Sequence, residues 1–294
     1  MVSEKCLRQY AELAVRLGVN VQKGHMLVIK AQVDSAPFVR MCVEEGYRAG
    51  AGEVIVQWLD DQITKLDYQY AETPVLQRVP DWLMAREQEF VDRGYCILHI
   101  DSSIPGIMKD VDQKKVQQVV TARRKALEKF QNYTMANLGQ WSIVAIPNPE
   151  WALKVFPQEQ PDTAVEKLWE AILKTVRVTE DNDPMAEWEA HDRGLKAHCE
   201  KLNALDLDYL HYQAPNGTDF KCWLIPEAQW HGGGDTLPDG TFFDPNMPTE
   251  EVFTSPMRGR CEGTLVSTMP LSYQGNLIDK FSVTFENGQA RERT

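Results

Sequence analysis

The sequence predicts an α/β protein with an N-terminal doubly wound parallel sheet, followed by a mostly β (α+β) C-terminal part. In the first half, short apolar runs of strand type alternate with segments whose apolar residues recur at helical spacing. Parallel strands need a helical crossover between them, so this alternation indicates a parallel sheet. After about residue 207, short β-type runs are separated by turns containing Gly, Asn, Asp and Pro, which is typical of β structure.

The elements of the first half follow from these patterns in order. The apolar runs predict four strands, at 26–33, 53–59, 95–101 and 141–147. The helical spacing predicts crossover helices and two later helices, at 36–51, 81–94, 113–131, 162–178 and 184–202. The last of these starts at Asp183-Pro184, where a capping residue precedes proline at the first helical position.

The acidic turn at 179–184 carries charge without apolar periodicity, which predicts a domain boundary. We therefore expect an N-terminal α/β domain at 1–183 and a C-terminal, catalytic-type domain at 184–294. The C-terminal β-type runs lie at 208–215, 220–226, 263–271 and 279–294. Asn287-Gly288 is a strong hairpin signal, but only Gln289–Thr294 follow it, so we expect this domain to be incomplete.

Composition limits the possible functions of the 294-residue chain. A hydrophobic content of 43% is enough for a sizeable core, and a net charge of -12 argues against nucleic acid and anionic membranes as partners. No apolar run approaches the ~18 residues of a membrane span. The six cysteines form no CxxC and the N-terminus resembles no secretory signal. Reduced thiols and a cytoplasmic location are therefore expected.

Most polar groups that could carry chemistry have a simpler structural explanation. The Gly-rich stretches 50–53 and 231–235 do not follow a strand and open a helix as phosphate loops do, so turns are favoured. The histidines show no spacing typical of metal ligands. Asp60-Asp61 follows a predicted parallel strand, where α/β proteins bind ligands, but a solvated loop is the favoured explanation.

Glu250 and Glu251 are the most informative pair, because they stand between a Pro248 turn and the β-type residues Val252-Phe253. Neighbouring side chains of a strand point to opposite faces, so one glutamate should face inward and the other solvent. A carboxylate in a water-poor site needs a partner. That partner is either a metal ion or an arginine, for which Arg258 and Arg260 are the available candidates.

The sequence around this pair resembles the M29 family of metallo-aminopeptidases (the thermophilic aminopeptidase T group). The resemblance rests on "NMPTEEVFTSP" at 246–256, with "PNGTDF" and "WHGGGDTLPDGTFFDPN" before it and "EGTLVSTMPLSYQGNLI" after it. It continues upstream through "PNPEWALKVFP", "ARRKALEKF" and "YAELAVRLGVNVQKGHMLVIKAQVDSAPFVR". It therefore covers essentially the whole chain.

The resemblance implies an enzyme that releases N-terminal amino acids from peptides with two divalent metal ions, which could be Zn, Co, Mn or Mg. It implies that Glu251 is the first metal ligand, because it stands directly before Val252-Phe253 as the family's ligand glutamate does. Glu250 occupies a variable position of the motif. A homodimer is also expected from the family.

The family's other metal ligands belong to a segment that follows the Asn287-Gly288 hairpin, so none can be assigned here. We therefore expect a C-terminally truncated aminopeptidase that is inactive alone. The alternative is a non-catalytic family remnant that acts by dimerisation with, or complementation by, a second chain. A third interpretation is a small-molecule binding module at the carboxyl edge of the parallel sheet.

Overall fold

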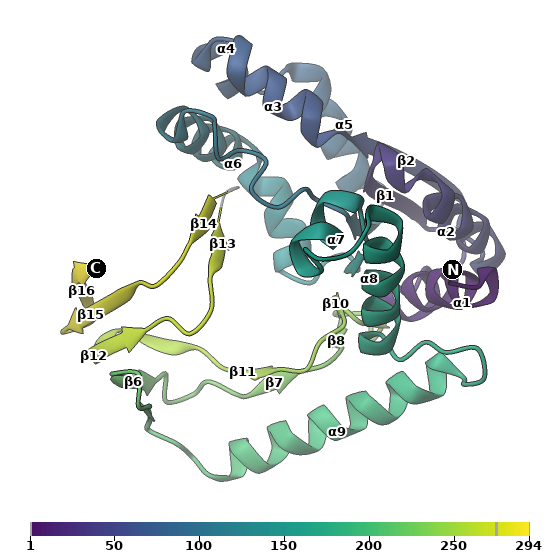
Figure 1. Ribbon diagram of the computed structural model, residues 1–294. Coiled ribbons are helices and arrows are strands. Elements are labelled where there is room, and N and C mark those ends of the chain that lie inside the picture. The colour runs from purple at the N-terminus through teal and green to yellow at the C-terminus, as the bar shows by residue number, and fades with distance from the viewer. Residues whose placement is uncertain (1, 274–275, 294) are drawn as a thin grey trace. The chain divides into compact units, whose positions relative to one another are not determined.

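The computed structural model describes residues 2–273 and 276–293, which form two compact units. The first unit contains the residues up to Ala190 together with Gly234–Thr249. The second contains His191–Gly233 and the residues from Glu250 onward. Figure 1 shows the elements of both units along the chain.

A parallel sheet forms the centre of the first unit, as the sequence predicts. Its five strands lie in the order β10-β4-β3-β1-β2, and all four of its pairings are parallel. The strands are β1 (Met26–Gln32), β2 (Glu53–Leu59), β3 (Cys96–Asp101), β4 (Trp141–Ala145) and β10 (Asn246–Met247). The fifth strand, β10, comes from the recognised motif and was not expected in this sheet.

Helices cover both faces of this sheet, so the expected doubly wound arrangement is confirmed. On β1, Leu27 and Ile29 enter the main core, whereas Met26 and Val28 enter a second core. This alternation is the period of two that a strand requires. The main core includes residues of α1 (Glu4–Leu13), α2 (Ala36–Ala49), α7 (Pro149–Val155) and α8 (Pro161–Thr175).

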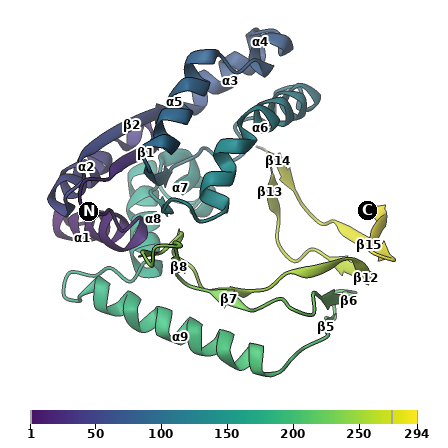
Figure 2. The ribbon, with the colours of Figure 1, turned by 180° about the vertical axis from the view of Figure 1, so that it is seen from behind.

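The second core lies on the other face of the sheet. It joins Phe90 of α5 (Asp81–Asp92) and Tyr133 of α6 (Gln113–Met135) to Tyr95 just before β3. The rings of Tyr95 and Tyr133 are stacked with centroids 5.2 Å apart. The short helices α3 (Asp61–Tyr70) and α4 (Thr73–Gln77) continue this layer, and Figure 2 shows α3, α4 and α5 beside α6 from behind.

The remaining helical elements are short or lie at the boundary of the units. A π-helical turn at Ala14–Gly18 extends α1, and a 3-10 turn at Val33–Ser35 follows β1. Helix α9 (Pro184–Ala204) starts at the predicted proline, and the Asp183 Oδ1 atom accepts hydrogen bonds from the backbone N–H groups of Met185 (3.0 Å) and Ala186 (3.3 Å).

No helix in 2–273 or 276–293 is long and apolar enough to span a bilayer.

The hydroxyl of Tyr10 extends the parallel sheet beyond its short edge strand. Tyr10 is fully buried; its hydroxyl donates to the Ala145 carbonyl at 3.0 Å and accepts from the Ala145 N–H at 3.1 Å. The pairing of β10 stops at Val144, so the phenol takes the place of a strand neighbour at Ala145.

Tyr10→Phe should therefore destabilise the first unit by about 1–3 kcal/mol, because two partly buried backbone groups lose a partner. Urea unfolding followed by circular dichroism measures the loss. Tyr70→Phe, at a side chain that is 82% exposed, should change stability by less than about 0.5 kcal/mol. Equal stabilities of the two variants would contradict the role assigned to the Tyr10 hydroxyl.

The second unit contains a five-stranded antiparallel sheet in the order β16-β15-β12-β6-β5. Its strands are β5 (Tyr209–Gln213), β6 (Asp219–Leu224), β12 (Pro256–Val266), β15 (Ser282–Glu286) and β16 (Gln289–Arg293). Asn287 and Gly288 both have positive φ, 51° and 74°, and connect β15 to β16 as the predicted hairpin turn. Four short strands form two further ribbons, β7 (His231–Gly232) with β11 (Val252–Phe253) and β13 (Leu271–Tyr273) with β14 (Asn276–Ile278).

Each compact unit consists of two separate segments of the chain, so no single boundary divides them. Segment 234–249, which contains the ribbon β8 (Asp235–Thr236) and β9 (Phe242–Phe243), belongs to the first unit although it follows β5 and β6 in sequence. The division into domains at 183/184 stays a prediction.

Candidate functional site

The motif at 246–256 runs from the first unit into the second. Asn246 and Met247 pair with Ile143 and Val144 of β4 in the first unit. A cis peptide bond joins Met247 to Pro248. Val252 and Phe253 pair with Gly232 and His231 in the second unit. The two glutamates thus lie on the second unit's side of the boundary, immediately before β11.

The Gly-rich stretch 231–235 has a structural role beside Glu251. A Cβ atom placed on Gly232 would lie 2.6 Å from the Glu251 carbonyl oxygen, so only glycine allows this close approach of the two strands. Gly233 has φ of 77°, a left-handed conformation in which glycine is favoured. The stretch, predicted as a turn, therefore includes the strand β7, which positions the backbone of Glu251.

The side chains of Glu250 and Glu251 are both exposed, so the expected contrast between an inward and an outward carboxylate is absent. The prediction assumed strand geometry at both residues, but β11 starts only at Val252. Glu250 Oε2 lies 3.9 Å from Nε2 of His191, which α9 contributes. Sequence inspection did not link these two residues, because they are far apart in the chain.

The arginine alternative for Glu251 finds no support. In the part of the chain that the structure describes, Glu251 makes no ion pair with Arg258 or Arg260. The guanidinium of Arg260 instead lies over the Trp223 ring, 5.1 Å from its centroid. The carboxylate of Glu251 is thus accessible to an external partner.

A metal ion is not accommodated by these residues alone. Across 2–273 and 276–293, no group of three or more His, Cys, Asp or Glu side chains is close enough to hold an ion. A catalytic metal site usually takes at least three protein ligands. Glu251 can supply one carboxylate, and the described residues do not fit the metal without further donors.

Asp60 and Asp61, the other acidic pair, have structural partners. The Asp60 Oδ1 atom caps α3 by accepting from the Ile63 N–H at 3.0 Å. Asp61 accepts from the Gln32 side-chain amide at 2.9 Å and from the Ile104 N–H at 2.8 Å. A small cavity of about 120 Å³ adjoins them at the carboxyl edge of the sheet. These hydrogen bonds favour a structural role over a ligand site.

Comparison with known proteins identifies the group to which the chain belongs. The model of the M29 family, described as thermophilic metalloproteases, matches residues 3–294. Aminopeptidase AmpS of Bacillus subtilis (strain 168) is 40% identical over 283 residues, which are 96% of this chain and 68% of AmpS. Aminopeptidase T of Thermus thermophilus is 34% identical over 286 residues, which are 97% of this chain and 70% of that protein.

A solved structure agrees with these matches. Wild-type AmpT from Thermus thermophilus superposes with a TM-score of 0.90 at 33% identity, covering 99% of this chain and 71% of that chain. The α/β fold class predicted from the sequence is therefore confirmed. The chain belongs to the M29 family, and its resemblance to the M29 metallo-aminopeptidases is confirmed.

Proposed function

We propose that this protein releases N-terminal amino acids from peptides, and that Glu251 is a ligand in a centre of two divalent metal ions. The proposal rests on one observation: Glu251 lies in the family motif, before Val252-Phe253, within a family match over residues 3–294. Its exposed carboxylate, without an arginine partner in the described structure, supports availability for a ligand role.

We further propose that residues 1–294 hold no metal pair by themselves. A single carboxylate cannot hold a divalent ion against water, since even weak multi-oxygen sites bind at roughly 0.1–1 mM. The relatives are longer than the matched region, which spans 68% of AmpS and 70% of aminopeptidase T. The remaining ligands would come from the part of the family architecture outside the match.

Two proteins test this proposal: the 294-residue chain, and the same chain joined to the part of AmpS that lies outside the match. Calorimetry with Zn, Co, Mn and Mg should show no binding tighter than about 0.1 mM for the short chain. Only the joined protein should release leucine from leucyl peptides. Metal-dependent release by the short chain would overturn the claim that it lacks a complete ligand set.

Substitution of the two glutamates tests the ligand. In the joined protein, Glu251→Gln should lower activity and metal affinity by at least about 100-fold, because even partners of metal ligands contribute 10–100-fold. Glu250→Gln is the matched control at the adjacent exposed residue, and it should keep activity within a few-fold. If Glu250→Gln lost activity and metal affinity while Glu251→Gln kept them, the ligand would be Glu250.

Location and assembly belong to the same proposal. All six cysteines are free in the structure, which is consistent with a reducing cytoplasm. We expect a homodimer, which sedimentation of the purified chain would measure. A second experiment mixes the short chain with an intact relative. If the short chain is inactive alone but changes the activity of that relative, it is a non-catalytic family remnant that acts by dimerisation or complementation, and the enzymatic proposal fails.

A further inference from the structure

A cavity of about 670 Å³ lies in the first unit, between the parallel sheet and helices α5 and α6. Lys30 on β1 stands in register with Gln57 on β2 and His99 on β3, so these side chains cross the sheet in a row. Arg86 and Glu87 of α5 and Arg123 of α6 complete its charged lining. Its volume is within the ~300–1,000 Å³ typical of small-molecule sites.

The charge of the cavity is opposite to that of the chain. Three of its side chains are cations, Lys30, Arg86 and Arg123, and one is a carboxylate, Glu87. Arg86 Nη2 already pairs with the Glu87 carboxylate at 2.6 Å. Two cations therefore remain without a carboxylate of the cavity, in a protein whose net charge is -12.

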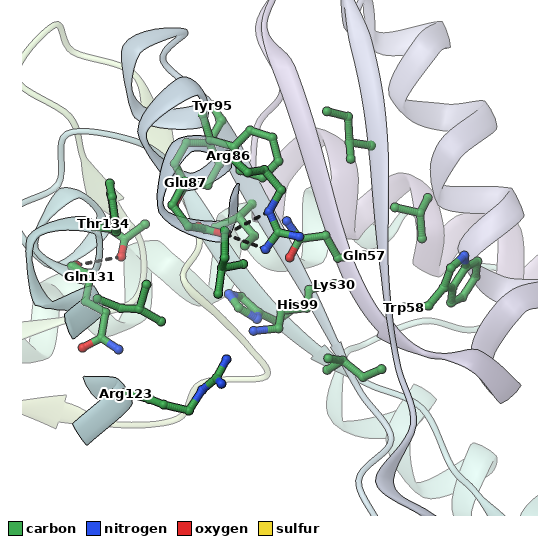
Figure 3. A pocket seen from close by; sticks show the side chains of 18 residues that line it. Lys30, Gln57, Trp58, Arg86, Glu87, Tyr95, His99, Arg123, Gln131 and Thr134 are labelled. Carbon is green, nitrogen blue, oxygen red and sulfur yellow. Dashed lines mark hydrogen bonds and ion pairs between the residues drawn. The ribbon is translucent and has the colours of Figure 1, made fainter. Parts of the chain in front are cut away.

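Lys30 is the least satisfied of these cations. It is partly buried, and burial lowers the pKa of its ammonium group. Within the described residues its Nζ atom has no hydrogen-bond acceptor or ion-pair partner. Figure 3 shows Lys30 beside His99, with the guanidinium of Arg123 directed toward them. A buried charge without a partner is costly unless a ligand or water compensates it.

The charge of Glu87 partly offsets the effect of burial on the pKa of Lys30, but this carboxylate already pairs with Arg86, and the other groups around Lys30 supply no further anion. Burial and the charge of Lys30 lower the pKa of His99 to about 4, so the imidazole is neutral at pH 7. Burial raises the pKa of Tyr95 to about 12, so its phenol stays protonated. Arg123 donates to the Leu76 carbonyl at 3.4 Å, a neutral acceptor.

The remaining walls are mostly apolar, with Gln131 and Thr134 of α6 as polar exceptions. The side chains of Leu83, Phe90 and Phe130 are buried, and they line the cavity together with Ile55 and Ile97. No glycine is among the described residues that line it. Arg86 and Arg123 stand within helices rather than in their first turns. Glycine loops and helix N-termini are the usual elements that bind phosphate, so these walls favour a different anion.

We propose that this cavity binds an organic carboxylate with an apolar or aromatic body. The carboxylate lies between Lys30 and Arg123, and the body packs on the apolar wall formed by Phe90 and Phe130. Planar guanidinium groups and ammonium groups both bind carboxylates well. The lining residues belong to the first unit, whereas Glu251 belongs to the second.

Calorimetry on the intact 294-residue chain tests the proposal with three probes: 4-phenylbutyrate, the neutral 4-phenylbutyramide and phenyl phosphate. We expect the carboxylate to bind at least about tenfold more tightly than the amide, because a hydrogen bond to a charged group contributes that much. Equal binding of the acid and the amide would overturn the proposal. Tighter binding of the phosphate would also overturn it, in favour of a phosphate site.

Variants locate the binding. Lys30→Met and Arg123→Met should each weaken 4-phenylbutyrate binding about tenfold or more. Lys125→Met removes a positive charge from the same helix at an exposed residue outside the lining, and it should leave affinity unchanged. Equal losses in all three variants would show a general charge effect and refute the site.

Stability without ligand provides a second measurement for Lys30. Removing a cation that lacks a partner should leave the melting temperature of Lys30→Met unchanged or raised, and 4-phenylbutyrate should stabilise only the parent chain and Lys125→Met. A lowered melting temperature of Lys30→Met, together with unchanged binding, would mean that Lys30 is a structural cation and would refute the proposal.

Discussion

Trp188→Ala should lower the stability of the first unit by about 4 kcal/mol or more. The Trp188 side chain is fully buried, and its indole N–H donates to the Val176 carbonyl at 2.8 Å. Removing a buried tryptophan costs about 3–5 kcal/mol through lost burial and the cavity left behind. The Val176 carbonyl, at the C-terminal end of α8, would lose this donor at a further cost of about 1–3 kcal/mol.

That loss is a large fraction of the ~5–15 kcal/mol typical of a domain, so much of the first unit would be unfolded at 37 °C. Hydrogen exchange of the β1 and β3 amides measures this unit separately, which matters because a chain with two units need not unfold in one step. Trp188→Phe keeps most of the apolar surface and should cost about half as much.

Trp82→Ala provides the matched control for a surface tryptophan. Trp82 is 66% exposed, and the Arg86 guanidinium lies over its ring, with Cζ 5.8 Å from the ring centroid. Its removal should change stability by less than about 1 kcal/mol. Unfolding of Trp188→Ala at the same urea concentration as the parent chain would contradict the role assigned to Trp188.

Gly263→Ala should strongly destabilise the second unit. Gly263 lies on β12 opposite Phe220, with φ of 100°. An added Cβ would lie 2.1 Å from the backbone oxygen of Asp219, so the paired strands β6 and β12 would have to separate. Left-handed backbone strain alone costs about 1–3 kcal/mol in an alanine, and the contact with a backbone oxygen adds to that cost.

Gly217→Ala separates these two contributions. Gly217 has nearly the same φ, 98°, but an added Cβ would meet only a Val266 methyl group at 3.7 Å, an ordinary contact. Its cost should therefore be the backbone strain alone, about 1–3 kcal/mol. Hydrogen exchange of the β6 and β12 amides should show faster opening in Gly263→Ala than in Gly217→Ala. Equal exchange rates would mean that the contact with Asp219 is relieved without cost.

Local patterns in the sequence were sufficient for most of the first unit. Strands β1 to β4 are mostly apolar because helices cover both faces of a parallel sheet, and such runs are visible without a structure. The start of α9 at Pro184 and the turn at Asn287-Gly288 were predictable for a similar reason. Each depends on the backbone preferences of one or two residues.

The motif around Glu251 allowed the family to be recognised, but its geometry depended on contacts distant in sequence. Asn246-Met247 forms a strand of the first sheet only because β4 offers a free edge there, and two residues carry no periodic signal. The expected inward direction of Glu251 assumed a strand that begins one residue later, at Val252.

Side-chain clusters required the tertiary structure altogether. Lys30, His99 and Arg123 come from separate elements, and nothing in their local sequence indicates that they line one cavity. The same holds for Glu250 and His191. Glu250 lies just before strand β11 and His191 lies on helix α9, and Glu250 Oε2 is 3.9 Å from His191 Nε2. Local sequence reports the preferences of a residue and its near neighbours, whereas a site depends on the register and packing of distant elements, which only the folded chain decides.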